Sequence, residues 1–135
     1  MLRSPLGMQT LGDVIATWQL ALGLDVDVSG EAVALMERDR DLTARVINVV
    51  SEGLTNAVRH ASTNAVRLAV SVDPEGSCVV VISHPGALSG RPQGLGSATI
   101  DGVCESWALR DTQGMVSLTC RLTPRRVAAV AVTDR

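Results

Sequence analysis

Three polar side chains that could hold a divalent cation recur at regular intervals near the middle of the chain. Glu52, Asn56 and His60 stand four residues apart, and at about 100° per residue they span roughly 80° of a helix surface. A carboxylate and an amide oxygen on one rigid face suit Mg²⁺, which keeps water ligands and shares substrate phosphates. The same spacing is typical of a solvent-facing polar stripe on an amphipathic helix. The spacing alone leaves both interpretations open.

A glycine pair forms the second candidate feature, in the stretch Gly94-Leu95-Gly96. Two glycines let the backbone approach a ligand closely, and free amides at a helix start favour a phosphate group there. The pair is also consistent with a tight turn, because the G-x-G-x-x-G fingerprint fails at Thr99. A Walker A loop is excluded, since all twelve basic residues are arginines and the chain has no lysine.

The composition excludes several classes of protein. The chain has 135 residues, a formal net charge of −2 and 46% hydrophobic residues, which indicates one globular domain. The absence of Phe and Tyr disfavours a nucleic-acid binder that stacks bases on aromatic rings. The nearly balanced charge provides no basic field for nucleic acid or an anionic membrane. Without lysine, Schiff-base chemistry is excluded.

The cysteines indicate the compartment. The chain has an odd number of cysteines, namely Cys78, Cys104 and Cys120. They lie far apart in the sequence and show no C-x-x-C spacing. This pattern disfavours a disulfide framework and a zinc site, and it favours a reducing, intracellular location.

Hydrophobic periodicity predicts the elements that position these residues. Helical spacing predicts four helices, over residues 10–22, 30–38 and 41–61 and through the segment from Ile100 to Trp107. Alternation of apolar residues predicts five strands, over residues 24–28, 66–72, 78–83, 116–122 and 127–133.

The order of these elements predicts the fold class. The strand over residues 78–83 is apolar on both faces and is expected at the centre of a sheet. Asp73-Pro74-Glu75-Gly76 is expected to be the hairpin turn before it, and residues 84–93 a polar loop after it. Because hairpins join most strands, we expect an α/β (α+β) two-layer sandwich. Its mixed, mostly antiparallel sheet would carry helices on one face.

The middle of the chain resembles a known family. The stretch Ser-Glu-Gly-Leu-Thr-Asn-Ala-Val-Arg-His-Ala over residues 51–61 resembles the N box of GHKL (Bergerat-fold) ATPases. It is most similar to the ATP-binding catalytic domain of two-component sensor histidine kinases. The following strand and the glycine pair come in that family's order, and residues 6–26 resemble the segment that precedes the domain. The resemblance implies one ATP-binding domain over residues 1–135, with residues 1–9 as a remnant of a linker.

The resemblance also implies roles for individual residues in the binding of Mg·ATP. Asn56 would ligate the Mg²⁺ that bridges the nucleotide phosphates. Glu52 would act as general base or orient the phosphoryl acceptor, and His60 would line the phosphate side of the site. Arg59 would either help to neutralise the phosphates or lie on the surface as an ordinary arginine.

The glycine motif completes the implied site. Gly94, Leu95 and Gly96 would bring backbone amides to the phosphates, and residues 87–93 would form a short ATP lid. The implied activity is phosphoryl transfer to a histidine on a separate dimerisation and phosphoacceptor domain, which would serve a response regulator. Neither His60 nor His84 is placed like that acceptor, so the chain would be the catalytic half of a cytoplasmic kinase.

One motif departs from the family's pattern. The family's Asp-x-Gly-x-Gly box, whose aspartate binds the adenine amino group, corresponds here to His84-Pro85-Gly86-Ala87-Leu88. A neutral imidazole can still accept a hydrogen bond, but losing the charged partner could weaken adenine binding by roughly tenfold to hundredfold. The alternative function is therefore a degenerate GHKL module, with weak or no nucleotide binding, that acts through protein contacts like an anti-sigma factor or pseudokinase. A Ser–His hydrolase has little support, since no Gly-x-Ser-x-Gly elbow is present.

Overall fold

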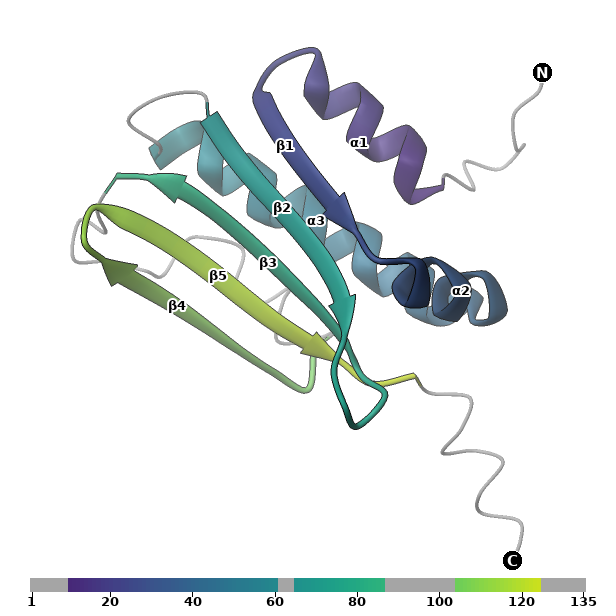
Figure 1. Cartoon of the computed structure of the whole chain (residues 1–135). Coiled ribbons are helices and arrows are strands. Elements are labelled where there is room, and N and C mark those ends of the chain that lie inside the picture. Colours follow the sequence, from purple (N-terminus) through teal and green to yellow (C-terminus); the bar gives the residue numbers. More distant parts are fainter. Residues whose placement is uncertain (1–9, 61–64, 87–103, 125–135) are drawn as a thin grey trace, which may run out of the picture.

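A computed structural model describes residues 10–60, 65–86 and 104–124 of the chain (Figure 1). The helices in these segments are α1 (Leu11–Gln19), α2 (Gly30–Arg38) and α3 (Arg40–His60). The strands are β1 (Gly23–Val28), β2 (Ala65–Val72), β3 (Cys78–Pro85), β4 (Ser106–Thr112) and β5 (Met115–Leu122). No helix within the described segments is long and apolar enough to cross a membrane.

The strands form one mixed sheet in the order β1-β2-β3-β5-β4. β1 and β2 are parallel, whereas the pairs β2–β3, β3–β5 and β4–β5 are antiparallel. The helices lie on one face of the sheet, with α3 crossing behind β2 in Figure 1. The predicted two-layer sandwich and the central place of β3 are therefore confirmed.

The core lies between α3 and the inner face of the sheet. Apolar residues of α3 recur at intervals of three and four, which gives the helix one buried side. The side chains at every second position of the strands point toward α3 and pack against this buried side. The core residues with no exposed surface in α3 and in β2, β3 and β5 are Leu42, Val46, Val49, Val50, Leu54, Ala57, Leu68, Cys78, Val80, Cys120 and Leu122.

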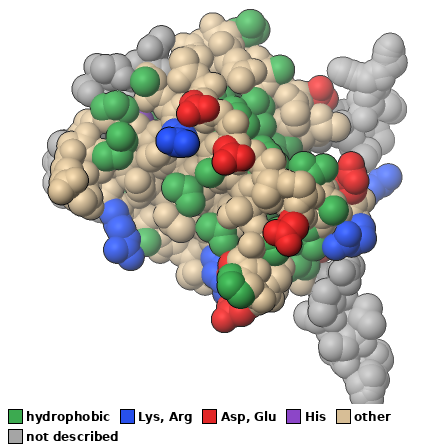
Figure 2. All heavy atoms as spheres, viewed as in Figure 1, with side chains coloured by type: hydrophobic (Ala, Val, Ile, Leu, Met, Phe, Trp, Pro, Cys, Tyr) green, Lys and Arg blue, Asp and Glu red, His purple; other side chains and the backbone are tan. Residues whose placement is uncertain are grey.

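The opposite face of the sheet is mixed in character. Figure 2, in the same view as Figure 1, shows hydrophobic, acidic and basic side chains interspersed on it. Arg67 of β2 and Asp25 of β1 face each other at 3.9 Å, and both side chains are largely exposed. The side chains on this side of the sheet are at least partly exposed to solvent, and the helix-covered side is the one that can build a buried site.

The prediction of a helix from Ile100 to Trp107 is wrong over residues 104–107, the part that the structure describes. Cys104 is not helical, and Trp107 lies in β4, where it pairs with Cys120 of β5. Trp107 and Leu109 alternate toward the core, and Gln113-Gly114 forms the turn to β5 with φ values of 54° and 79°. Such left-handed turns are typical of two-residue hairpins. The beginning of that predicted helix and the predicted strand over residues 127–133 lie outside the described residues.

The strand before the expected polar loop is longer than predicted. β3 continues through His84 and Pro85, which the sequence analysis assigned to the loop. His84 pairs with Val116 of β5, and its side chain is buried like that of Ile82 two positions earlier. The alternation therefore continues with an imidazole at an inner position, where an apolar side chain would be the usual signal of a strand.

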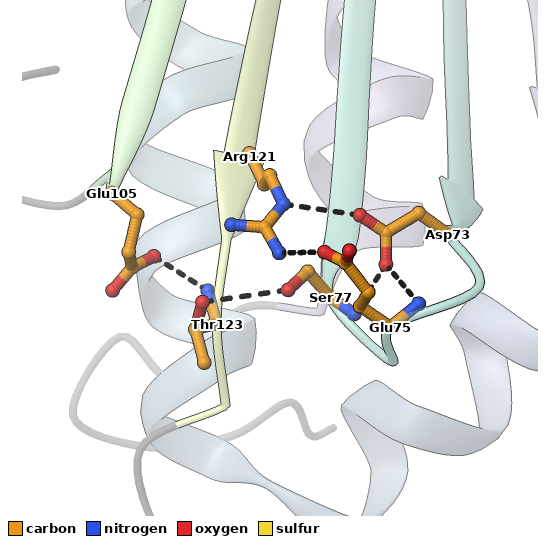
Figure 3. A network of polar contacts seen from close by, with 6 residues as sticks. All are labelled: Asp73, Glu75, Ser77, Glu105, Arg121 and Thr123. Atoms are coloured by element: carbon orange, nitrogen blue, oxygen red, sulfur yellow. Dashed lines mark hydrogen bonds and ion pairs between the residues drawn. The ribbon is translucent and has the colours of Figure 1, made fainter.

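The predicted hairpin turn before β3 is confirmed and is tied to β5. Oδ1 of Asp73 accepts hydrogen bonds from the amides of Glu75 and Ser77, at 3.0 and 2.9 Å. Arg121 of β5 donates from Nε to Asp73 Oδ2 at 3.1 Å and from Nη2 to Glu75 Oε1 at 2.7 Å (Figure 3). The Ser77 amide and the Arg121 guanidinium hold the pKa of Asp73 below its usual value.

Candidate functional site

The first half of α3 is anchored over the end of β5 by a buried arginine. Nη2 of Arg45 donates to the carbonyl oxygen of Thr123 at 2.7 Å, and Nε donates to Oδ2 of Asp41 at 2.9 Å. The Arg45 side chain is only 6% exposed, so its charge is compensated by these acceptors. Asp39 caps the helix by accepting from the Leu42 amide at 3.0 Å. The start of the helix is therefore fixed relative to the sheet.

The middle of α3 touches the sheet at a glycine. A β carbon added at Gly53 would overlap Cδ1 of Ile82 on β3 and lie 3.3 Å from Cδ2 of Leu118 on β5. Ile82 and Leu118 are directly paired across the two strands. The absence of a side chain at residue 53 thus allows the helix backbone to approach β3 and β5 closely.

These two contacts define the direction of α3. Arg45 reaches the residue after Leu122, which pairs with Cys78 at the start of β3, whereas Gly53 lies on Ile82. The eight helical steps from Arg45 to Gly53 rise about 12 Å, and the four strand steps from Cys78 to Ile82 span about 13 Å. The helix therefore runs along β3 in the same direction, with closely matched rise.

The same arithmetic places His84 relative to the polar stripe of α3. His84 lies two residues beyond Ile82, which is about 7 Å further along the strand. That rise corresponds to roughly four or five helical residues, which is the level of Ala57 and Val58, one helical turn beyond Gly53. Ala57 is fully buried, whereas Asn56 is half-buried at the flank of the packed face. His84 therefore lies on the helix-covered face beyond the contact of Gly53 with Ile82, toward the part of α3 that carries Asn56.

The imidazole of His84 is oriented by the backbone of the next residue, Pro85. The side chain is 7% exposed, and Nδ1 lies 3.0 Å from the carbonyl oxygen of Pro85. A carbonyl oxygen can only accept, so Nδ1 carries the hydrogen and donates it. In the neutral ring, Nε2 is then left with a lone pair. His84 thus presents a hydrogen-bond acceptor from a buried position.

The chain leaves β3 through a glycine. Gly86 has a φ of 142°, a backbone conformation that residues with a side chain rarely adopt. Its amide donates to the carbonyl oxygen of Gly114, in the turn between β4 and β5, at 2.9 Å. The end of β3 is therefore attached to the neighbouring hairpin, and glycine is required where the chain turns away.

The structure brings together only part of the predicted site. Glu52 and Asn56 lie one turn apart on α3, both half-buried, and Arg59 further along is exposed. His60 is the last residue of α3, but the position of its side chain is outside the description. Gly94, Leu95, Gly96 and the expected lid over residues 87–93 also lie outside the described residues.

Two residues that hold α3 in position on the sheet, Gly53 and Arg45, were not predicted from the sequence to have a role. Gly53 stands inside a predicted helix on its apolar side, where glycine costs about 1 kcal/mol relative to alanine. That cost is a usable signal of close packing. Arg45 carried no comparable signal, because its acceptor, the Thr123 carbonyl, is 78 residues away in the sequence.

The donor set suits a magnesium ion that is shared with a nucleotide. Within the described residues, no three His, Cys, Asp or Glu side chains gather into a metal site. The carboxylate of Glu52 and the amide of Asn56 are oxygen donors on one helix face, and Mg²⁺ accepts few protein ligands when phosphates and water supply the others. The residues present therefore fit such an ion, and they do not fit an all-protein cage.

Comparison with known proteins identifies the fold. No family profile matches the chain, and no curated protein matches it in sequence. Solved structures do match. The blue-light activated histidine kinase EL346 of Erythrobacter litoralis superposes with a TM-score of 0.70 at 18% identity, over 88% of this chain and 42% of that one. The histidine kinase AdeS of Acinetobacter baumannii superposes with a TM-score of 0.61 at 13% identity, over 86% and 66%.

A third match contains a nucleotide analogue. Full-length ShkA in complex with AMPPNP has a TM-score of 0.58 at 11% identity, over 90% of this chain and 30% of that one. At these identities the likeness concerns the fold alone. The chain thus shares the α/β sandwich fold of these histidine kinase structures, and it spans less than two thirds of the length of each of the three.

Proposed function

We propose that this chain is the ATP-binding catalytic domain of a sensor histidine kinase, formed by residues 1–135 with residues 1–9 as a linker. The observation that supports the proposal is the contact of Gly53 with Ile82, because Asn56 follows Gly53 by about one helical turn and His84 follows Ile82 by two strand residues. Asn56 would then supply a cation ligand from α3, and His84 would supply a buried hydrogen-bond acceptor from β3.

The phosphate end of the site would belong to α3. Asn56 would ligate Mg²⁺ through its amide oxygen, and the ion, when bound, would offset the phosphate charge. Glu52, one turn earlier, would orient the phosphoryl acceptor or take its proton. His60, at the end of the helix, would line the phosphates. The amides of residues 94–96 would supply the remaining contacts, since the chain has no lysine.

The base end of the site would belong to β3. The lone pair on Nε2 of His84 would accept a hydrogen bond from the amino group of adenine. Gly86 would leave room beside the base, because it has no side chain. The neutral acceptor supports weaker binding than a carboxylate would, since hydrogen bonds to charged groups are roughly twice as strong as neutral ones.

The acceptor of the phosphoryl group would be a histidine on a separate dimerisation domain. His84 is poorly suited to that role, since it is buried to 93% in the domain that would bind the nucleotide. A response regulator would then receive the phosphoryl group, and the reaction would take place in the cytoplasm, where ATP is available.

A second candidate function follows from the same histidine. If His84 and Leu88, which replace the aspartate and second glycine of the family's box, prevent base binding, the chain is a regulatory module that acts through protein contacts. The two candidates predict opposite results in a titration with nucleotide.

Isothermal titration calorimetry with Mg·ATP and Mg·ADP tests the proposal. We expect saturable binding below millimolar nucleotide and a loss of about tenfold or more for Asn56→Ala, because one cation ligand is removed. Asn48→Ala is the matched control, since Asn48 is an exposed asparagine on the same helix, and its affinity should equal that of the wild type. No heat of binding at millimolar nucleotide would overturn the kinase proposal in favour of the regulatory module.

A further inference from the structure

Two cysteines that are distant in the sequence share one region of the core. Cys120 is fully buried at an inner position of β5, between Val80 of β3 and Trp107 of β4. Cys104, which precedes β4, is half-buried and packs against the same core cluster. Neither cysteine is part of a disulfide bond. The two thiols therefore stand at either end of the segment that contains the β4–β5 hairpin, and the hairpin brings these ends back toward each other.

The backbone next to Cys104 is held against β5 by two hydrogen bonds. The amide of Glu105 donates to the carbonyl oxygen of Arg121 at 2.9 Å. The amide of Thr123 donates to Oε1 of Glu105 at 2.6 Å, and Figure 3 shows this side chain reaching across to the end of β5. The position of Cys104 relative to β5 is therefore determined by the fold and does not depend on the thiol itself.

The two thiols are within hydrogen-bonding reach of each other. A hydrogen bond with the Cys104 side chain, reinforced by burial, raises the pKa of the Cys120 thiol. Cys120 is therefore protonated and shielded, whereas Cys104 retains some exposure. A reagent from solution would meet Cys104 first, and Cys120 is the thiol placed to react with the product.

We propose that Cys104 and Cys120 are a redox modification site, which forms a reversible disulfide on exposure to a low-molecular-weight disulfide such as oxidised glutathione. The proposal goes beyond the proposed kinase function and does not depend on nucleotide binding. The pair lies at the end of the sheet near Arg121, four residues along β5 from Val116, the partner of His84.

The reaction proceeds by two exchanges. The Cys104 thiolate attacks one sulfur of the small disulfide, which forms a mixed disulfide at Cys104 and releases one thiolate. Cys120 then loses its proton to that thiolate and attacks Sγ of Cys104. This forms the Cys104–Cys120 bond and breaks the mixed disulfide, and the second small thiolate takes up the proton that Cys104 lost when it became a thiolate. The protein gives up two electrons and two protons, and the small disulfide takes them up as two thiols.

Cys78 provides an internal control. It is fully buried at the start of β3, where burial raises the pKa of its thiol to about 11. The other groups that influence this pKa are Arg45 and Asp73, neither of which is a thiol. A reagent that merely opens the core would attack Cys78 as readily as Cys120, whereas the proposed exchange spares it.

The experiment treats the folded full chain with excess oxidised glutathione and then alkylates the remaining thiols in denaturant. Mass spectrometry is expected to find one alkylated cysteine, Cys78, and a peptide that links Cys104 to Cys120 and is released by dithiothreitol. Oxidation should raise the melting temperature by about 5 °C, because the bond closes a loop in the unfolded chain. Cys104→Ser should abolish the link, and Cys78→Ala should leave it intact.

Several outcomes would overturn the proposal. These are three alkylated cysteines after treatment, a glutathione adduct that persists on Cys104, or a bond that includes Cys78. Cys104→Ser is the decisive variant because Cys104 is half-buried, so its substitution preserves the fold more readily than a change at Cys120. Circular dichroism of each variant before oxidation ensures that the thiols are compared in folded protein.

Discussion

Gly53 of α3 lies directly against Ile82 of β3, with no space for a β carbon between them. Ile82 is itself 2% exposed and paired with Leu118, so its side chain cannot move away without disturbing the core. This contact fixes the height of α3 above the sheet, and Glu52 and Asn56 stand on either side of it. The geometry of the candidate site therefore depends on a residue that has no functional group.

Gly53→Ala is expected to destabilise the domain. The added methyl group overpacks the core at a cost of about 1–3 kcal/mol, which exceeds the roughly 1 kcal/mol gained in helix propensity. Gly12→Ala is the matched control in α1, where the nearest atom to a β carbon would be Oγ1 of Thr10 at 3.7 Å. Gly12→Ala should stabilise the domain. Urea unfolding measures both, and equal stabilisation by the two variants would contradict the packing argument.

His84→Asp is expected to tighten Mg·ATP binding by about tenfold, because a charged acceptor replaces a neutral one opposite the amino group of adenine. Mg·GTP serves as the control, since guanine presents a carbonyl oxygen at that position and should gain nothing. Calorimetric titration measures both nucleotides, and a thermal melt checks that the variant is folded. Unchanged affinity for Mg·ATP would show that residue 84 does not contact the base.

Arg45→Met is expected to lower the free energy of unfolding by about 2 kcal/mol, because it leaves the Thr123 carbonyl without its buried donor. Asp41→Asn removes only the charge of the exposed partner, whose side chain is 53% exposed, and should cost less than about 1 kcal/mol. Chemical denaturation measures both values. Equal losses would assign the anchoring of α3 to the ion pair rather than to the contact with Thr123.

The stability of the domain is expected to depend on Asp73 in acid. Its pKa is lowered in the folded state, so its contribution is present above the unfolded pKa of about 3.9 and is lost as the pH falls through the folded value. Asp73→Asn should therefore melt below the wild type at pH 7, and the difference should shrink below about pH 4. Asp25→Asn, in an exposed pair at 3.9 Å, should have little effect at pH 7. A difference for Asp73→Asn that is constant with pH would contradict the assignment.

Local patterns in the sequence determined a large part of this protein. The apolar periodicity of α3, the turn at Asp73-Pro74 and the double-sided apolar run of β3 each depend on neighbouring residues, and each was predicted. The fold class followed from the order of these elements. The polar stripe with Glu52 and Asn56 was also local, because residues four apart on a helix share a face whatever packs against it.

Contacts between distant segments decided the rest. Periodicity could not show that His84 continues β3, because an inner strand position is defined by the helix that covers it. It could not show β4 either, since Trp107 fits a helical and an alternating pattern until its partner on β5 is known. The height of α3 at Gly53 and the meeting of Cys104 with Cys120 likewise arise only when the sheet pairs. Sequence spacing specifies which face a side chain takes, and tertiary packing specifies what that face meets.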